Sequence, residues 1–469
     1  MPVLDIQGED ASMTIAQDLA ARINALTYEN FPSEAVHWAK IAIADTIGVA
    51  LAGAVEDTAK IPERVLGAGN MPGSSLVWGR SYRTRALDAA LINGTASHAF
   101  DFDDCSNTLG GHPSAPIVPV ALAIGEEVGA TGQEYVEAYI AGFEAETRVA
   151  RGVHMHHYTK GWHPTATLGI FGAIAACGKL LKLNDDQLAT ALAIGVSEAA
   201  GVKANFGTMT KPLHVGLTAR NGLFACLMAK EGFTASMEAF EHKQGYLEVF
   251  NGAGTYDVAK MLDGWGEPLD LIEPGVMIKQ YPCCGSTHMA IDAAVPLHAK
   301  LSPSVEDIEK IEIETHEQRL EHTNRPDPLG ELAAKFSVQY VVCRALIDGK
   351  VVLENFENEA YMDPGMRSLL PKVTAASHTD DPYTGIVTVT LKDGSTHTEQ
   401  ARTPFGRGPE NPMSADELKA KFIDCATRVL PSDAAERLHA ALWDIENLKS
   451  VGEITTAMEL PPGAAQAAE

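Results

Sequence analysis

One segment concentrates the residues whose types could carry acid–base chemistry. HAFDFDDCSNTLGGHPSAP, residues 98–116, holds three aspartates and two histidines beside a Gly-Gly pair and two prolines. His112 stands in a Gly-Gly-His-Pro turn, where a carboxylate such as Asp101 could orient its ring. Imidazole changes its charge near neutral pH. The pattern therefore favours proton transfer by His112, with Asp101 as its partner.

The same segment permits two other interpretations. Its imidazole and carboxylate groups suit magnesium, manganese or iron, and the candidate ligands are His98, Asp101, Asp103, Asp104 and His112. However, the segment is neither an EF-hand loop nor an HExxH helix, so we expect no metal here. Asp103 and Asp104 could instead cap helices and accept hydrogen bonds from loop amides.

A second histidine-rich segment is VHMHHYTKGWHPTATLG, residues 153–169. His154, His156 and His157 fit no common metal-ligand spacing, and we expect them on an exposed loop. His163 differs, because it precedes Pro164 and a helical start. Its ring is expected at a helix N-terminus, where backbone donors favour an anion.

Two further segments bring lysines into an acidic chain. Lys211 precedes Pro212 in VKANFGTMTKPLHVGLTARNG, where it is either a solvated lysine or part of a site. IKQYPCCGSTHMAIDAA sets Lys279 and His288 around a Pro-Cys-Cys-Gly turn, and Lys279 is expected to reach into a cleft. The adjacent cysteines lack the CxxC spacing of redox motifs, so reduced thiols are expected.

These groups together indicate the class of substrate. Lysines could neutralise carboxylates and lower the cost of a carbanion or enolate, while a histidine moves the proton. We find no glycine-rich phosphate fingerprint and no nucleophile elbow. The inventory therefore suits a small di- or tricarboxylate.

The amino-acid composition disfavours two classes of binding partner. The 469 residues include 62 acidic and 36 basic ones, giving a formal net charge of -26, which disfavours nucleic acid and anionic membranes. The beginning, MPVLDIQGEDASM, is acidic where a signal peptide is basic and then apolar, and no segment approaches ~18 consecutive apolar residues. We expect a soluble cytoplasmic protein without a membrane span.

The elements that must position these groups are mostly helices up to about residue 270. Apolar residues recur at helical spacing from Thr14 and again after Pro32-Ser33, and Thr131 with Glu134 forms a capping box. The pattern then changes, because residues 310–317 and 385–400 alternate, the latter around an Asp393-Gly394 turn. Ser414 with Glu417 is a second capping box, which opens a return to helix.

The predicted fold class is mainly α. A large all-helical domain of residues 1–271 and 405–469 is interrupted by a smaller α+β lid domain of residues 272–404, inserted before the C-terminal helices. A cleft between the two domains would be a natural binding site.

Five motifs then resemble a known family. HAFDFDDCSNTLGGHPSAP, GWHPTATLG, GTMTKPLHVG, KQYPCCGSTH and FSVQYVVCRALIDG are similar, in the same order, to motifs of the MmgE/PrpD family, across residues 12 to 450. The resemblance implies a helical domain with an α+β lid, a homodimer, and catalysis without a metal or organic cofactor. Activities in the family include dehydration of 2-methylcitrate, decarboxylation of cis-aconitate and epimerisation of iminodisuccinate.

The resemblance also implies site residues. It makes His112 the proton-transfer residue, Asp101 its orienting or acid/base partner, and Lys211 with Lys279 the groups that hold carboxylates. Four further residues would complete the pocket or bind substrate: His163, Tyr340, Cys105 and His288. Cys105 stands where the decarboxylase has a threonine, and the loop before His112 is one residue longer, which disfavours cis-aconitate decarboxylation.

The leading functional hypothesis is a cofactor-independent carbon–oxygen lyase that dehydrates a 2-methylcitrate-like hydroxy acid. Epimerisation of an iminodisuccinate-like substrate and cis-aconitate-type decarboxylation remain alternatives, because they share the first step or the stabilised carbanion. Two other classes are a metal-dependent enzyme built on the Asp/His segment, and a non-catalytic carboxylate-binding protein on an enzyme scaffold.

Overall fold

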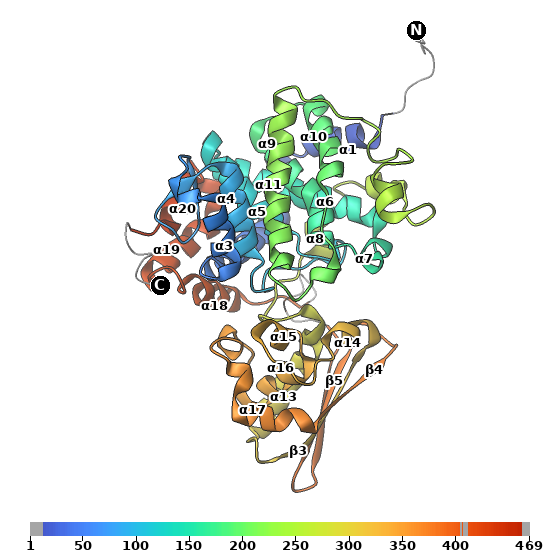
Figure 1. Cartoon of the computed structure of the whole chain (residues 1–469), viewed down its shortest axis with the longest axis vertical. Coiled ribbons are helices and arrows are strands. Elements are labelled where there is room, and N and C mark those ends of the chain that lie inside the picture. Colours follow the sequence, from blue (N-terminus) through green and yellow to red (C-terminus); the bar gives the residue numbers. More distant parts are fainter. Residues whose placement is uncertain (1–12, 404–405, 407–410, 462–469) are drawn as a thin grey trace.

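The computed structural model describes residues 13–403, 406 and 411–461. They form two main hydrophobic cores stacked along the long axis of the molecule (Figure 1). The large core takes its buried residues from Ile15 to Ile278 and again from Met413 to Met458. The small core takes them from Tyr281 to Val389. The predicted second domain boundary, between residues 404 and 405, lies outside the described residues.

The large core consists almost entirely of helices. Its N-terminal helices are α1 (Ile15–Ala25), α2 (Ser33–Gly53), α3 (Asp57–Leu66), α4 (Ala86–Ser97), α5 (Ser114–Val128), α6 (Gly132–Val153), α7 (His156–Lys160), α8 (Pro164–Thr167), α9 (Gly169–Leu181), α10 (Asp185–Glu198), α11 (Thr210–Lys230) and α12 (Val258–Leu262). The C-terminal helices are α18 (Ala415–Ala426), α19 (Ser432–Trp443) and α20 (Gly452–Met458). A short antiparallel pair, β1 (Ser75–Leu76) with β2 (Arg83–Thr84), lies at its edge.

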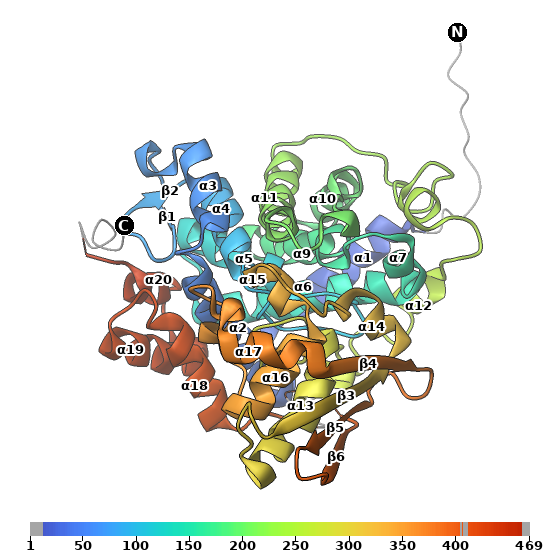
Figure 2. The same ribbon diagram turned by 60° about the horizontal axis from the view of Figure 1, so that its bottom comes forward.

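Local sequence signals set several of these helix ends. Both predicted capping boxes are confirmed, with Thr131 accepting from the amide of Glu134 and Ser414 from that of Glu417. Of the C-terminal helices, α18 and α19 then pack against α2, and Figure 2 shows them beside it. Helices from both ends of the chain therefore share one core.

The small core combines helices with one mixed sheet. Its helices are α13 (His288–Leu301), α14 (Glu317–Thr323), α15 (Glu331–Lys335), α16 (Val338–Asp348) and α17 (Pro364–Leu369). Its strands are β3 (Ile308–His316), β4 (Val373–His378), β5 (Gly385–Leu391) and β6 (Thr396–Ala401), in the order β4-β3-β5-β6. The predicted hairpin of β5 and β6 is confirmed, whereas β4, a mostly exposed edge strand parallel to β3, was not predicted.

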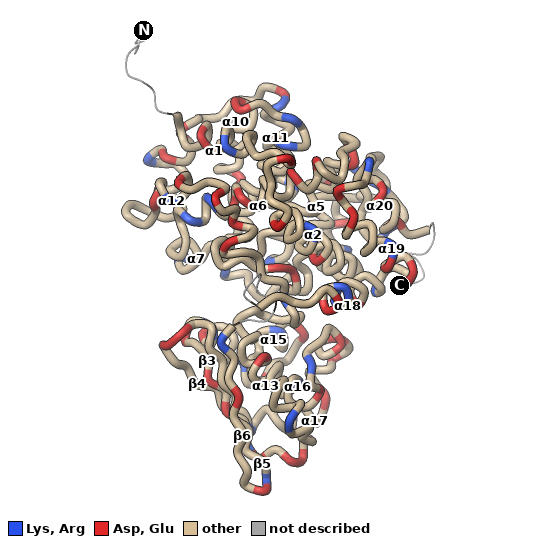
Figure 3. The backbone as a smooth tube through the Cα atoms, turned by 180° about the vertical axis from the view of Figure 1, so that it is seen from behind, with Lys and Arg blue, Asp and Glu red and all other residues tan. Residues whose placement is uncertain are grey.

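Two helical segments, Ser33–Gly53 and Pro164–Leu181, are long and apolar enough to span a membrane by length and mean composition alone, although neither is an unbroken apolar run. Their most apolar windows are 83% and 94% buried inside the protein. Burial of this extent is what core helices show, and both helices contribute to the large core. Asp and Glu residues are spread along the backbone of both parts of the molecule (Figure 3).

The prediction that His154, His156 and His157 lie on an exposed loop is wrong for most of the segment, because only His156 is exposed and α7 begins at that residue. His157 lies on α7 and is fully buried, with its ring nitrogens 2.9 Å from Asn251 Oδ1 and 2.7 Å from Thr167 Oγ1. The contact with Asn251 joins residues 94 positions apart, so no local pattern could reveal it.

Candidate active site

The loop between α4 and α5 carries the residues that open the sequence analysis, and backbone pairing ties it to a distant segment. Cys105 and Met277 exchange two backbone hydrogen bonds of 2.8 Å, which brings Lys279 to the same place. Lys335 of α15 lies over the Phe100 ring at 4.3 Å, so the small core also touches this loop. The loop is thus held between the two cores.

Two glycines allow the loop to approach its neighbours closely. A Cβ at Gly111 would lie 2.7 Å from Thr165 Oγ1, and one at Gly110 would lie 2.3 Å from a ring carbon of His154. The Thr165 hydroxyl also accepts a 3.0 Å hydrogen bond from the His112 amide. The close packing of Gly110 and Gly111 and the hydrogen bond of the His112 amide therefore fix the backbone position from which the His112 side chain extends.

Asp101 is the centre of a cluster of positive groups. Its Oδ1 accepts hydrogen bonds from Lys211 Nζ at 2.8 Å and Lys279 Nζ at 3.0 Å, and Lys279 also donates to the Asp101 carbonyl. Burial raises the pKa of Asp101, but the two ammonium groups and His112 outweigh it and hold the pKa well below the ordinary value. Asp101 also has a left-handed backbone with φ +54°, a conformation that clusters at functional sites.

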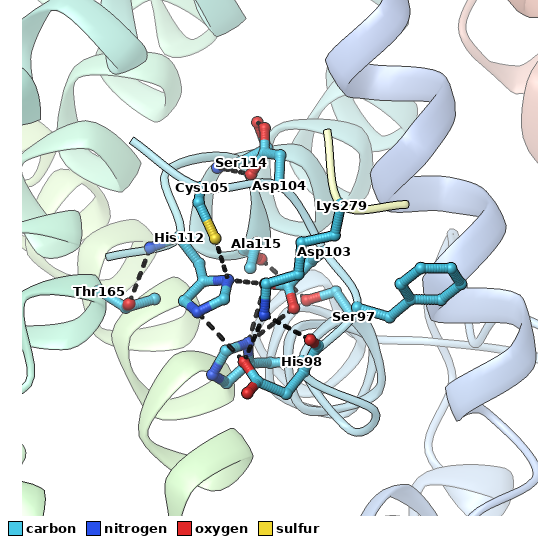
Figure 4. A network of polar contacts seen from close by, with 12 residues as sticks. Ser97, His98, Asp103, Asp104, Cys105, His112, Ser114, Ala115, Thr165 and Lys279 are labelled. Atoms are coloured by element: carbon cyan, nitrogen blue, oxygen red, sulfur yellow. Dashed lines mark hydrogen bonds and ion pairs between the residues drawn. The ribbon is translucent and has the colours of Figure 1, made fainter. Parts of the chain in front are cut away.

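His112 lies between two carboxylates, and Figure 4 shows its ring beside Asp103. Its Nε2 is 3.2 Å from Asp101 Oδ1, and its Nδ1 is 3.2 Å from Asp103 Oδ2. Burial alone would lower the pKa of His112, but the facing carboxylates raise it well above the ordinary value. Because an imidazole can donate from both nitrogens only when charged, this geometry favours an imidazolium.

Asp103 and His98 form the support of His112, a role that sequence analysis did not assign. His98 Nδ1 lies 2.8 Å and 2.9 Å from the two oxygens of Asp103, and both side chains are fully buried. Burial lowers the pKa of His98 to about 4, so this ring is neutral and donates its Nδ1 proton. Asp103 therefore stays charged between one neutral and one charged imidazole. The HxxxxD spacing was the only sequence signal for this pair.

Asp104 has the structural role that the sequence analysis gave as an alternative, which is to cap a helix and accept hydrogen bonds from backbone amides. It accepts hydrogen bonds from the amide and the hydroxyl of Ser114 at the beginning of α5, and that hydroxyl lies 2.7 Å from Tyr139 Oη. Burial raises the pKa of Asp104 to about 7. The helix-capping interpretation therefore describes Asp104, whereas Asp103 belongs to the histidine cluster.

Lys211 and His163 join the cluster from α11 and α8. Lys211 is only 6% exposed, so the solvated alternative is wrong. His163 precedes the four-residue α8, and its Nδ1 lies 3.2 Å from His214 Nδ1. Burial and the nearby Lys211 hold the pKa of His163 well below its ordinary value, which leaves the ring neutral.

The other three predicted site residues are Cys105, His288 and Tyr340, and they differ in how close they lie to Asp101 and His112. Cys105 Sγ is 3.8 Å from His112 Nδ1. His288 opens α13 with its ring 3.3 Å from the Cys283 carbonyl, and burial and Lys279 lower its pKa to about 3. Tyr340 lies inside the small core, where its hydroxyl donates to the Asn355 carbonyl and accepts from Arg344. Among the described residues, Tyr340 has no recorded contact with Asp101 or His112.

A metal ion is geometrically conceivable here, because ligand atoms of His98, Asp101, Asp103 and His112 lie within 4.8 Å of one another. The donor set nevertheless fits a divalent ion poorly. Two ammonium groups already occupy Asp101 Oδ1, and Asp103 is shared by two imidazoles. A cation entering this cluster would displace or be repelled by the lysines. All seven cysteines are free, as expected.

The chain is similar in sequence to known proteins with two different activities. The chain is 29% identical to a cis-aconitate decarboxylase of Homo sapiens over 96% of this chain and 95% of the relative. It is 24% identical to a cis-aconitate decarboxylase of Aspergillus terreus over 96% of this chain and 97% of that protein. A 2-methylcitrate dehydratase of Cupriavidus necator is 24% identical over 59% of this chain and 60% of its own length.

Family models cover most of the sequence. The MmgE/PrpD N-terminal domain matches residues 17–259, which hold the Asp101, His112 and Lys211 cluster. The MmgE/PrpD C-terminal domain matches residues 281–447, which include the small core and the first two C-terminal helices. The chain therefore belongs to the MmgE/PrpD family.

Proposed function

We propose that this protein is a cofactor-independent lyase acting on a small di- or tricarboxylate, and that it removes water from a 2-methylcitrate-like hydroxy acid. The observation that carries the proposal is the pairing of an anionic Asp101 with a cationic His112, 3.2 Å apart, beside two buried lysines. Elimination of water needs a base for the proton and an acid for the leaving hydroxide.

Through the two lysines, binding of the substrate changes the basicity of Asp101. In the substrate-free protein Lys211 and Lys279 neutralise Asp101, which makes that carboxylate a weak base. A substrate carboxylate offers both ammonium groups a second partner, and any shift of their hydrogen bonds onto it raises the basicity of Asp101. The same lysines stabilise the negative charge that develops next to the substrate carboxylate.

His112 then acts as the proton donor. Clamped between Asp101 and Asp103, it enters the reaction charged. Asp101 abstracts the proton next to a carboxylate, the C–O bond breaks, and the imidazolium gives its proton to the departing hydroxide, so water leaves. The His112 proton is later replaced by the one that Asp101 has taken, and the site is restored.

Decarboxylation is the second candidate, and the relatives favour it, since two of those described above bear that name over nearly the whole chain. It would use the same lysines and the same imidazolium, with the proton delivered to the carbanion that remains after carbon dioxide leaves. The position of Cys105 beside His112, where the decarboxylase resemblance expects threonine, favours dehydration instead.

Product analysis distinguishes these reactions. The purified protein is incubated separately with 2-methylcitrate, citrate, cis-aconitate and iminodisuccinate in deuterated water, and proton NMR follows each mixture. Loss of water from a citrate supports the dehydratase, and carbon dioxide release from cis-aconitate supports the decarboxylase. Deuterium entry without net loss supports the epimerase. If none of the four acids changes, the lyase proposal is contradicted for this substrate class.

A further inference from the structure

A second group of side chains, three basic residues and one tyrosine, lies near the Asp101 cluster, and none of the activities considered above assigns it a role. Its members are Tyr158 and Lys203 from the large core, and Arg319 and His322 from α14. All four are half-buried. Figures 1 and 2 both place α7, which carries Tyr158, next to α14. We call these four residues the distal cluster.

Lys203 is fixed against Tyr158. Its ammonium lies 3.5 Å from the centre of the Tyr158 ring and donates a 3.2 Å hydrogen bond to the Tyr158 carbonyl. Both partners are neutral, so they position the charge without cancelling it. The backbone of Lys203 also donates to the Gly161 carbonyl at 2.8 Å, which joins this residue to the segment that follows α7.

Arg319 and His322 are three positions apart on α14 and so share a helix face. Arg319 lies over the Tyr383 ring at 5.0 Å and donates to the Pro382 carbonyl. The His322 Nε2 lies 3.0 Å from the Ser286 hydroxyl. The turn that carries Ser286 borders the active site, because a Cβ at the adjacent Gly285 would lie 3.8 Å from Lys279 Cε.

The charges of the distal cluster are compensated only from a distance by carboxylates, with Glu321 near Lys203 and His322 and Asp381 near Arg319. Other buried cations of this protein are ion-paired, for example Lys421 with Asp45 and Arg148 with Glu144. In the part of the chain that the structure describes, no ion pair joins Lys203, Arg319 or His322 to a carboxylate. Burial lowers the pKa values of Lys203 and Arg319, as expected of cations with incomplete compensation. In a chain with a net charge of -26, such a gathering of unpaired cations favours an anionic ligand.

Electrostatic coupling connects this cluster to the reacting centre. The pKa of Tyr158 is raised to about 12 by burial, by Cys284 and by Asp101. Tyr158 therefore feels the charge of the residue that Lys211 and Lys279 hold. The geometry agrees, because the Gly285-Ser286 turn contacts Lys279 on one side and His322 on the other, so a polycarboxylate held by Lys279 would extend toward the distal cluster along this turn.

We propose that Tyr158, Lys203, Arg319 and His322 form a second anion subsite, which binds a distal carboxylate of the substrate while Lys211 and Lys279 hold the reacting one. This inference rests on the proposed function and deepens it, because it requires a substrate with at least two separated carboxylates. The subsite would discriminate polycarboxylates from acids with a single carboxylate.

Binding of two unreactive probes tests the subsite. Isothermal titration measures tricarballylate, which has three carboxylates, and NMR line broadening measures butyrate, which has one. The wild type is compared with Lys203→Met and Arg319→Gln, and circular dichroism verifies that each variant is folded. Lys310→Met serves as the control, because Lys310 is an exposed strand residue paired with Glu312.

We expect each subsite variant to bind tricarballylate about tenfold more weakly or worse, because a charged hydrogen bond is lost. Butyrate binding should stay unchanged in both variants, and the control should bind both probes like the wild type. Wild-type affinity for tricarballylate in both variants, or equal loss of both probes, overturns the subsite alone. A wild type that binds neither probe contradicts the proposed function and removes the basis of the subsite with it.

Discussion

At the scale of single residues, the site is organised around a charge alternation. Two lysines, Asp101, His112 and Asp103 follow one another as positive, negative, positive and negative groups, all in the protein interior. Each charge lowers the cost of burying its neighbour. This arrangement gives His112 a charge at neutral pH and makes its protonation the most informative property to perturb.

The first prediction concerns the pH profile. Because His112 has a pKa well above its ordinary 6.5, kcat/KM should not fall as pH rises through 6.5 and should fall only at higher pH. Asp103→Asn keeps the shape and removes one of the two facing charges. The alkaline limb should then move to lower pH by about one unit or more. Asp104→Asn is the matched control, since Asp104 binds Ser114, and it should leave the limb in place.

The second prediction concerns stability. Asp101→Asn leaves Lys211 and Lys279 buried without their carboxylate, which should lower the free energy of unfolding by about 3–5 kcal/mol. Urea unfolding at pH 7 measures this. The pKa of Asp101 is depressed in the folded protein, so its contribution is present above its ordinary pKa of 3.8 and is lost as pH falls through the depressed value. A loss below about 1 kcal/mol at pH 7 would show that the lysines are solvated.

Sequence reasoning identified single residues better than their contacts. Residue types and loop positions pointed to Asp101 and His112, the family resemblance added Lys211 and Lys279 as carboxylate holders, and the structure brings all four together. The contact of Lys211 with Asp101 spans 110 residues, which only the fold can create. The Asp103 and His98 pair was missed because its function depends on how the loop turns between them.

At the scale of elements, the loop between α4 and α5, which carries Asp101 and His112, depends on close packing against its neighbours. We predict that Gly111→Ala lowers kcat/KM by about 100-fold or more, because a new Cβ 2.7 Å from Thr165 Oγ1 must move the loop that carries His112. Steady-state kinetics on the identified substrate measures this. Gly330→Ala is the control, since a Cβ there meets nothing within 4 Å and the backbone is extended, with φ 171°. Equal activity of both variants would contradict a rigid loop.

The C-terminal helix α18 supports the same loop from the other side. Lys421 donates to the Phe102 carbonyl at 2.9 Å and pairs with the buried Asp45 at 2.6 Å. Lys421→Met should therefore destabilise the protein by about 3–5 kcal/mol, since Asp45 is left buried and unpaired. Thermal and urea unfolding measure the loss. Adding Asp45→Asn should recover part of the stability, and a double variant no more stable than Lys421→Met would contradict this account.

The elements themselves were largely predictable where the pattern was local. Capping boxes at Thr131 and Ser414 and the Asp393-Gly394 turn placed helices and a hairpin correctly. The edge strand β4 was not predicted, because its side chains are mostly exposed and show no regular alternation. It pairs with β3 in parallel, and the two strands are far apart in the sequence. The sequence therefore contains no hairpin turn that would predict this pairing.

At the scale of the whole molecule, two cores meet around one loop. Backbone pairing of Cys105 with Met277, and the contact of Lys335 with Phe100, connect this loop to the segment between the cores and to the small core. The resemblance also implied Tyr340 as a site residue, but the structure places it within the small core. Its role in the site stays a prediction from the resemblance.

Assembly into a homodimer stays a prediction from the family resemblance. Light scattering after size-exclusion chromatography should give twice the mass of one chain at micromolar concentration. A mass equal to one chain throughout the concentration range would contradict it. This result would not affect the active-site account, because every residue of the Asp101 cluster comes from a single chain.

The most direct test of the central claim compares wild type with His112→Gln after both proteins are treated with EDTA. Proton NMR in deuterated water follows each with the substrate identified from the four acids. The account predicts full turnover of the chelated wild type and loss of turnover by a folded His112→Gln protein, because the charged His112 supplies the proton. Near-normal turnover by His112→Gln, or chelated wild type that is inactive until a divalent ion is restored, would contradict it.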